Sequence, residues 1–149
     1  MTDLSIKQVE NDAEWDVVRS IREEIFVVEQ ECPPEEEWDE FDSTATHFIA
    51  YWRGSAVGCA RMRTLTKETE TVAKLERFAI LKRWRGLGLG KRLVQGVMTR
   101  AKEAGHNRLY LHAQAHLEAL YADLGFEPEG DLFDEAGIPH IAMSLRVDD

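Results

Sequence analysis

Apolar side chains recur along this chain with two different periods, and the changes between them predict the order of helices and strands. A period near 3.6 residues indicates a helix with one buried face, whereas alternation indicates a half-buried strand. Strand-like segments span 4–9, 47–52, 56–63, 71–81, 108–113, 126–129 and 140–145, and helix-like segments span 12–28, 34–39, 89–104 and 116–124. The resulting order, βααβββαβαββ, predicts an α/β fold of the α+β kind, with a mixed sheet that carries helices on both faces.

Capping and turn residues mark several boundaries between these segments. Asn11–Glu14 has the spacing of a capping box at the start of the first helix. Arg53–Gly54 predicts a tight turn between two strands. We expect the last two strands to be joined by a loop that passes through Asp134, Gly137 and Pro139.

The length and composition indicate one globular unit. The chain has 149 residues, of which 44% are hydrophobic, so we expect a single domain over residues 1–149 with one substantial core. No apolar run approaches the roughly 20 residues that span a membrane, and the first residues do not resemble a signal peptide. These features predict a soluble, cytoplasmic protein without a membrane partner. The formal net charge of −10 disfavours binding to nucleic acid, which depends on basic side chains, and favours a cationic partner.

The cysteine and histidine residues form no disulfide or metal pattern. Cys32 and Cys59 are far apart in the sequence and make no metal-type pair. Cys59 lies in an apolar strand and is expected to be a buried thiol, whereas Cys32 lies in a loop. His112 and His116 are separated by a predicted break between strand and helix, which removes the helical geometry that a metal pair needs. We therefore expect no bound metal.

A glycine-rich segment, Arg85-Gly86-Leu87-Gly88-Leu89-Gly90-Lys91, connects a predicted strand to the helix 89–104. Such a turn directs backbone N–H groups and the positive end of a helix dipole at one point, which suits a pyrophosphate. Glycine also lets the backbone come close to the phosphates. The spacing differs from a Walker A loop, because Arg85 replaces the first glycine and Arg92 the hydroxyl residue, and it differs from the dinucleotide fingerprint G-x-G-x-x-G. A glycine-rich loop without a ligand is the structural alternative.

The segment matches R-x-x-G-x-G, and a second motif follows it, Tyr121-Ala122-Asp123-Leu124-Gly125-Phe126. Together the two motifs resemble the acetyl-CoA loop and the Tyr-x-x-x-Gly-Phe helix end of the GNAT N-acetyltransferase superfamily. Phe26-Val27-Val28-Glu29-Gln30 and Ala136-Gly137-Ile138-Pro139-His140 are similar to its ElaA-like branch. The resemblance covers nearly the whole chain and implies the acyl-CoA N-acyltransferase fold, with a mixed, mostly antiparallel central sheet.

The resemblance implies acetyl-CoA as the co-substrate and assigns residues to it. The phosphates would lie on Arg85, Gly86, Leu87, Gly88, Leu89, Gly90 and Lys91. The strand residues Phe78, Ala79 and Ile80 would pair with the pantetheine amides, and one of their N–H groups would polarise the thioester carbonyl. Gln114 takes the position at which many family members have an asparagine that binds pantetheine.

The resemblance also implies catalytic residues, since an alkylamine with a pKa of about 10.4 gains from a base and the departing thiolate gains from an acid. Tyr121 is the predicted general acid. Glu76 is the first candidate for the general base, followed by Glu29 and His112 near the expected acceptor region. Three of these candidates have a structural alternative: Tyr121 and His112 as packed side chains, and Glu76 as a solvated or salt-bridged carboxylate beside Lys74 and Arg77.

The acidic segment, residues 29–42, contains eight acidic side chains and no basic one, and Pro33-Pro34 ends the first helix within it. In the GNAT family this part of the chain walls the acceptor pocket, where carboxylates would attract an amine or polyamine. The alternative is a solvated, poorly ordered acidic loop.

These features together predict an acetyl-CoA-dependent N-acetyltransferase that modifies the primary amine of a small molecule by direct attack in a ternary complex. The alternatives are transfer of a longer acyl group, a protein or peptide amine as acceptor, a non-catalytic acyl-CoA-binding sensor, and a nucleotide-binding module that uses the loop for ATP. Exposed sheet edges would also allow a homodimer.

Overall fold

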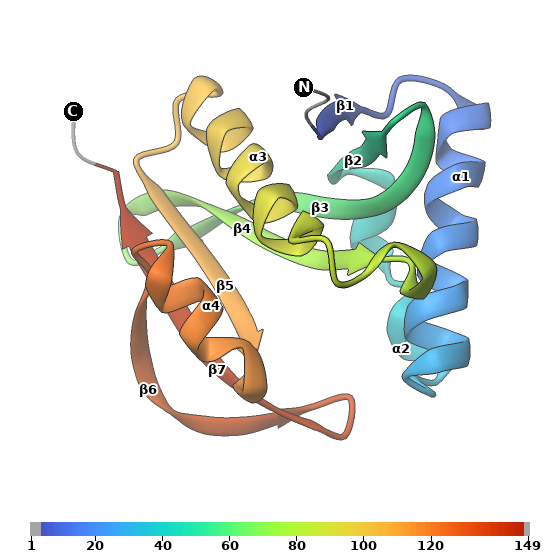
Figure 1. The fold of residues 1–149 in the computed structure, drawn as a ribbon. Helices are drawn as coiled ribbons and strands as arrows, with labels where there is room; N and C mark the ends of the chain where they lie inside the picture. The colour runs from blue at the N-terminus through green and yellow to red at the C-terminus, as the bar shows by residue number, and fades with distance from the viewer. Residues whose placement is uncertain (1–3, 148–149) are drawn as a thin grey trace.

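The computed structural model describes residues 4–147, apart from the side chain of Glu36, and these residues form one seven-stranded sheet. The strands are β1 (Ser5–Gln8), β2 (Thr46–Trp52), β3 (Ser55–Lys67), β4 (Glu70–Ile80), β5 (Arg108–Gln114), β6 (Glu127–Glu135) and β7 (Ile138–Arg146). Their order across the sheet is β1-β2-β3-β4-β5-β7-β6. Neighbouring strands are antiparallel except β4 and β5, which are parallel, so the predicted mixed and mostly antiparallel sheet is confirmed (Figure 1).

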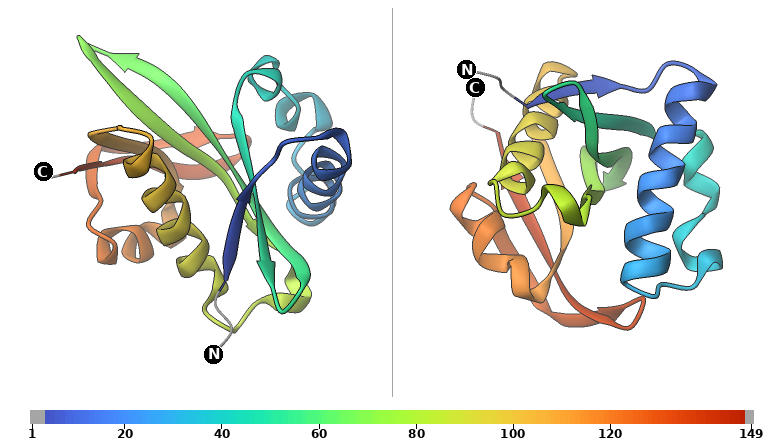
Figure 2. Two further views of the ribbon diagram at one scale, coloured as in Figure 1. Left: turned by 90° about the horizontal axis from the view of Figure 1, so that it is seen from above. Right: turned by 45° about the vertical axis from the view of Figure 1, so that its right-hand side comes forward.

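Helices cover both faces of this sheet. They are α1 (Asp12–Arg22), the π-helix η1 (Glu23–Glu29), α2 (Pro34–Glu37), α3 (Leu89–Glu103), α4 (Glu118–Asp123) and the 3₁₀ turns η2 (Glu40–Ser43), η3 (Lys82–Trp84) and η4 (Ala115–Leu117). The views in Figure 1 and Figure 2 place α1 and α2 on one side of the sheet and α3 and α4 on the other. No helix within residues 4–147 is long and apolar enough to cross a membrane.

The first helix begins at the predicted cap and then changes its winding. The side chain of Asn11 accepts a hydrogen bond from the backbone N–H of Glu14 at 2.9 Å. The Glu14 carboxylate accepts from the N–H of Glu10, at 2.8 Å, so the second bond of the expected capping box is displaced by one residue. α1 ends at Arg22, and η1 continues to Glu29, close to the predicted end of the helix.

Two hydrophobic clusters hold the layers together. The larger cluster lies between the sheet and α3, where Leu93, Val97 and Ala101 are buried along one face of the helix. The smaller cluster lies between α1 and the sheet, and includes Val18 and Ile21. Successive strand side chains point to opposite faces, so the central strands supply both clusters.

The parallel strands β4 and β5 pair only at their beginnings. Ala73 pairs with Leu109 and Lys74 pairs with Tyr110, and beyond these residues the two strands separate. Among the described residues, the β5-facing edge of β4 therefore has no strand partner beyond Lys74. The separation is visible in Figure 1 as a widening wedge between the two strands.

A bulge in β4 accompanies this separation. Two residues of β4, Arg77 and Phe78, lie opposite the single Ala60 of β3, and Arg77 has a φ of 58°. Bulges bend the strand that contains them. Beside the bulge β3 approaches β4 so closely that a Cβ atom on Gly58 would lie 2.3 Å from the carbonyl oxygen of Ala79, which explains the glycine.

The C-terminal hairpin differs from its prediction. A two-residue turn, Ala136-Gly137, joins β6 to β7, and its φ values of 53° and 78° are those of a tight hairpin. The predicted loop is wrong, because Asp134 and Pro139 are paired strand residues. β6 is an edge strand rich in acidic side chains, so it lacks the alternation that marks a half-buried strand.

Candidate active site

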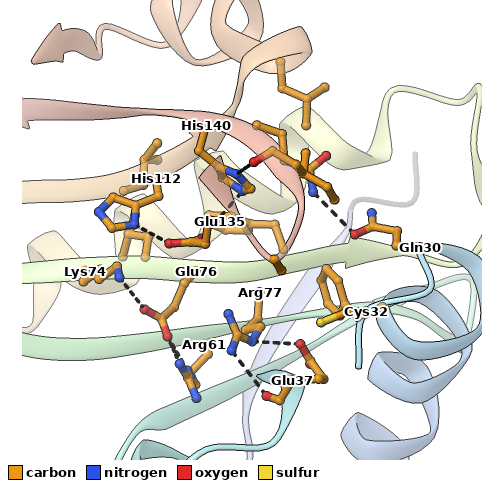
Figure 3. A pocket seen from close by; sticks show the side chains of 18 of the residues that line it. Gln30, Cys32, Glu37, Arg61, Lys74, Glu76, Arg77, His112, Glu135 and His140 are labelled. Carbon is orange, nitrogen blue, oxygen red and sulfur yellow. Dashed lines mark hydrogen bonds and ion pairs between the residues drawn. The ribbon is translucent and has the colours of Figure 1, made fainter. Parts of the chain in front are cut away.

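The space between β4 and β5 opens into a pocket of about 420 Å³, a size typical of small-molecule sites. The lining includes residues 74–78 of β4, Arg61 and Arg63 of β3, His112 and Gln114 of β5, Tyr121 of α4, and Glu135 and His140 of the C-terminal hairpin. The acidic segment contributes Glu37 and Asp39. Figure 3 shows His112, Glu135 and His140 on one side of the pocket and Lys74 and Glu76 of β4 on the other.

The predicted phosphate loop follows β4 and starts α3. Gly86 and Gly88 have φ values of 86° and 76°, which residues with side chains rarely adopt, and Gly88 is the N-cap of α3. The first N–H groups of a helix lack partners within the helix, and no side chain caps them here. The start of this 15-residue helix therefore suits an anionic ligand.

Both cations of the loop are paired with carboxylates. Arg85 donates two hydrogen bonds to Glu29, at 2.5 and 2.9 Å, and its Nε donates to the carbonyl of Ile80 at 2.8 Å. Lys91 forms an ion pair with Asp123. The hydrogen bond from Arg85 lowers the pKa of Glu29. Glu29 was expected near the acceptor, but it pairs with Arg85 of the loop and does not line the pocket.

Tyr121 combines a packed ring with an unpartnered hydroxyl. The residue is 6% exposed, and its ring lies 6.4 Å from that of Phe78 and 6.1 Å from that of Phe126 between centroids. Its side chain lines the pocket, and its hydroxyl has no hydrogen-bond partner within residues 4–147. Burial raises the pKa of Tyr121 to about 12, so the phenol stays protonated and can donate a hydrogen bond.

Glu76 lies on the pocket wall, but three cations share its carboxylate. Nε of Arg61 donates to Oε2 at 2.5 Å, and Nε of Arg63 lies 3.2 Å from both oxygens. Nζ of Lys74 lies 3.4 Å from Oε1. Nearby cations favour the ionised form of a carboxylate and so weaken it as a proton acceptor. The geometry matches the structural alternative, a salt-bridged carboxylate, better than the role of general base.

The acidic segment folds onto arginines of α1 and β3. Glu37 is 2% exposed and accepts from Nε of Arg22 at 2.6 Å, and Arg22 is itself 1% exposed. Asp42 accepts from Arg22 at 2.7 Å and from Arg61 at 2.9 Å. Asp39 accepts from Arg61 at 2.7 Å. The acidic segment does form part of the pocket wall, but arginines pair with its carboxylates. The alternative of a solvated loop therefore does not apply to Glu37, Asp39 and Asp42.

The same segment holds the bulge of β4. Nε of Arg77 lies 3.1 Å from a Glu37 oxygen, and its Nη2 lies 3.4 Å from an Asp39 oxygen. Nη2 also donates to the main-chain carbonyl of Glu37, at 3.3 Å. A positive φ at a non-glycine residue costs on the order of 1 kcal/mol or more, and these contacts offset that cost. The acidic segment thus helps to shape the opening of the sheet.

Two histidines and a carboxylate lie across the pocket from β4. Nδ1 of His112 donates to Glu135 at 2.8 Å, and its Nε2 lies 3.0 Å from the hydroxyl of Tyr110. Nδ1 of His140 lies 2.7 Å from the carbonyl of Ile138, so this nitrogen carries a proton and Nε2 of the neutral ring keeps a lone pair. That Nε2 lies 3.6 Å from the other oxygen of Glu135, whose pKa the hydrogen bond from His112 lowers.

Sequence reasoning missed Glu135 and His140. Glu135 lies in the segment that was expected to be a loop, whereas His140 begins a predicted strand, and only the pairing of β7 with β5 brings His140 beside Gln114. Gln114, which was expected to bind pantetheine, lines the pocket, and its amide nitrogen lies 3.4 Å from the side-chain oxygen of Gln30. Cys59 is buried as expected, which raises its pKa to about 12. The described part of the chain holds no cluster of three potential metal ligands.

Sequence comparisons identify the family to which the chain is related. Residues 12–147 match the family model of the acetyltransferase (GNAT) domain. The uncharacterized N-acetyltransferase YjcF of Bacillus subtilis (strain 168) is 34% identical over 124 residues, which cover 83% of this chain and 86% of that protein. Protein ElaA of Escherichia coli (strain K12) is 30% identical over 125 residues, which cover 83% of this chain and 81% of ElaA.

Solved structures share the fold over nearly the whole chain. The crystal structure of Escherichia coli ElaA has a TM-score of 0.83 and 25% identity, and the match covers 98% of this chain and 100% of ElaA. An acyl-CoA N-acyltransferase from Pseudomonas aeruginosa has a TM-score of 0.80 and 31% identity, and the match covers 97% of this chain and 99% of that enzyme.

Replacement of Glu37 by Gln should destabilise the protein strongly, because it removes the buried carboxylate that Arg22 and Arg77 share and leaves them only Asp42 and Asp39. Breaking a buried pair in this way costs about 3–5 kcal/mol. Urea unfolding measures the change in the free energy of unfolding. Glu35→Gln, an exposed change in the same helix, is the control and should stay within about 0.5 kcal/mol of wild type. Equal effects of the two substitutions would contradict this account of the pair.

Proposed function

Since the chain belongs to the GNAT acetyltransferase family, we propose that it transfers the acetyl group of acetyl-CoA to the primary amine of a small molecule, by direct attack in a ternary complex. The observation that carries the proposal is the pocket between β4 and β5, which brings together the unpartnered hydroxyl of Tyr121 and the imidazole of His140. The glycine loop follows the β4 wall of the same pocket. A hydrogen-bond donor, a proton acceptor and an anion site are the parts that this reaction needs.

The features around β4 fit acetyl-CoA. The glycine loop would hold the pyrophosphate through backbone N–H groups, and the unpaired edge at Phe78, Ala79 and Ile80 would pair with the pantetheine amides as a strand does. Gln114 lines the same space and offers both a donor and an acceptor. When bound, acetyl-CoA supplies the thioester carbon that the amine attacks. A backbone N–H beyond the bulge would donate to the thioester oxygen as negative charge develops there.

Tyr121 serves the departing sulfur as a hydrogen-bond donor. A thiol has a pKa of about 8.5, whereas burial raises the pKa of Tyr121 to about 12. Complete transfer of the phenolic proton to a thiolate would therefore be uphill by about 5 kcal/mol. The hydroxyl stabilises the negative charge while the carbon–sulfur bond breaks, and the proton that finally neutralises the thiolate comes from solvent.

His140 is the proposed acceptor of the amine proton. A backbone carbonyl fixes its Nδ1 proton, so Nε2 is ready to accept, and Glu135 stabilises the imidazolium that forms. The three candidates from the sequence are less suited: Glu76 holds three cations, Glu29 lies outside the pocket lining, and both ring nitrogens of His112 are hydrogen-bonded.

Thiol release from acetyl-CoA in the presence of a panel of amines tests the proposal, with Tyr121→Phe beside wild type. Loss of the hydroxyl should lower kcat by about 10²-fold or more and leave the Kd for CoA nearly unchanged, because the packed ring is kept. Tyr51→Phe removes a hydroxyl outside the pocket lining and should keep wild-type turnover. Wild-type kcat in Tyr121→Phe would contradict this role. CoA binding without any amine-dependent release would favour a sensor.

Replacement of His140 by Gln should lower kcat/KM by about 10²-fold at neutral pH, because Gln keeps a polar side chain but cannot take up a proton. The deficit should shrink at high pH, where more of the amine is already unprotonated. A pH profile of kcat/KM measures this change. His116→Gln, an exposed histidine outside the pocket lining, is the control. A deficit that stays constant at every pH would argue against proton transfer to His140.

Replacement of Glu29 by Gln should tighten CoA binding by about two- to fivefold, because it frees Arg85 from a half-exposed ion pair of the usual modest strength. Isothermal titration calorimetry at low salt measures the Kd, and the gain should shrink as salt is added. Glu23→Gln removes an exposed charge from the same π-helix and should change the Kd little. Weaker CoA binding by Glu29→Gln would show that the carboxylate supports the loop arginine rather than competing for it.

A further inference from the structure

Lys74 lies where β4 and β5 separate, and its ammonium group has few partners. Its side chain is 14% exposed and lines the pocket, and its Nζ lies 3.4 Å from Oε1 of Glu76. Within residues 4–147 the Nζ atom forms no other ion pair or hydrogen bond, and at this distance the contact with Glu76 is too long to be a good hydrogen bond. An ammonium group has three N–H donors. Lys74 therefore reaches the pocket with donor capacity that the protein does not use.

The cluster around Lys74 has one more cation than it has carboxylates. Its cations are Arg22, Arg61, Arg63, Lys74 and Arg77, and its carboxylates are Glu37, Asp39, Asp42 and Glu76. Glu76 makes its shortest contacts with Arg61, and its contacts with Lys74 and Arg63 are longer and therefore weaker. Nη1 and Nη2 of Arg63 donate to no acceptor within residues 4–147, and the guanidinium stacks on the ring of Phe41 at 4.0 Å.

The excess of one positive charge in this cluster is accompanied by a lowered pKa of the Lys74 ammonium. Burial and then the nearby Arg63 lower the pKa of the Lys74 ammonium from its usual value of 10.5 to about 8. Glu135, on the opposite side of the pocket, opposes this shift but does not cancel it. A bound anion beside Lys74 would satisfy its donors and restore its charge.

The opposite side of the pocket has the complementary sign. Glu135 is ionised, since the hydrogen bond from His112 lowers its pKa, and it lies beside Nε2 of His140. An ammonium group of an acceptor would be attracted to Glu135 and would lie next to the nitrogen that takes its proton. The pocket thus offers a site for a positive group on the hairpin and a site for a negative group on β4, as Figure 3 shows for Lys74 and Glu135.

We propose that the acceptor is an amine that also carries a carboxylate, such as an amino acid, and that Lys74 together with Arg63 binds this carboxylate. The inference rests on the proposed acetyl transfer for the identity of the acceptor. The carboxylate binds the cations of β3 and β4, the amine faces His140 and Glu135, and the distance between the two sites selects the length of the acceptor. A single negative charge matches the single surplus cation, which favours a carboxylate over a dianionic phosphate group.

Matched acceptors test the inference. Each α- or ω-amino acid of a panel is compared with its primary amide, which has nearly the same shape and no negative charge. Wild type should show at least about tenfold higher kcat/KM with the amino acid for the best pair, because charged hydrogen bonds are the strong ones. In Lys74→Met the ratio between the two acceptors should fall close to one. Lys74→Arg keeps the charge and should retain most of the preference, and Lys102→Met, an exposed change in α3, should leave the ratio unchanged.

A binding measurement separates this inference from the proposed reaction. Carboxylic acids that lack an amine, and their amides, are titrated into the CoA complex at constant ionic strength, and the Lys74 Nζ signal is followed by NMR. Saturable binding of the acid alone, lost in Lys74→Met, supports the carboxylate site even if no amine is acetylated. Acetylation of amines without any preference for the carboxylate, or a preference that survives in Lys74→Met, overturns the inference and leaves acetyl transfer in place. Unfolding of Lys74→Met would be detected by its melting curve, and Lys74→Gln then takes its place.

Discussion

The buried ion pair between Arg22 and Glu37 is the interaction on which the site depends. Removal of two ions from water costs several kcal/mol each, and their attraction compensates only when further hydrogen bonds complete the geometry. Arg22 meets this condition, since it also donates to the main-chain carbonyl of Glu37 at 2.9 Å and to Asp42 at 2.7 Å. Few other positions of the acidic segment would satisfy these donors, so the pair fixes the segment against α1.

The position of the acidic segment decides the shape of the pocket. Once Glu37 is held by Arg22, its second oxygen and the neighbouring Asp39 meet Arg77, the residue with a positive φ in the bulge of β4. The bulge lies where β4 has left β5, so the edge that would receive pantetheine depends on a carboxylate cluster on the other side of the strand. A charge in the acidic segment can therefore affect the shape of the pocket through Arg77, in addition to lining it.

The features that the sequence predicted are those that local spacing encodes. The glycine loop and Tyr121 lie in short motifs, and the order of strands and helices follows from hydrophobic periods, so both could be predicted. The partners of Glu37 could not be predicted, because Arg22 and Arg77 lie on elements that are distant from it in the sequence. The sequence around Glu37 shows only a run of acidic residues. Glu76 was proposed as a base for the same reason, since two of its three cations, Arg61 and Arg63, lie on a neighbouring strand. His140 could not be identified as a site residue, because only the pairing of the strands places it in the pocket. The other strand of its hairpin, β6, is an acidic edge strand, and its sequence does not show the alternation of a half-buried strand.

The distribution of charge inside the pocket matters more for the acceptor than the net charge of −10. Exposed charges are screened over about 8–10 Å at physiological salt, whereas partly buried groups act at short range with less screening. The acidic segment, which supplies many of the negative charges, is largely neutralised where it meets the pocket by Arg22, Arg61 and Arg77. In the proposed reaction, attraction of an amine would therefore fall to Glu135, beside the proposed base. The sign of each wall, rather than the acidity of the chain, would then orient the proposed acceptor.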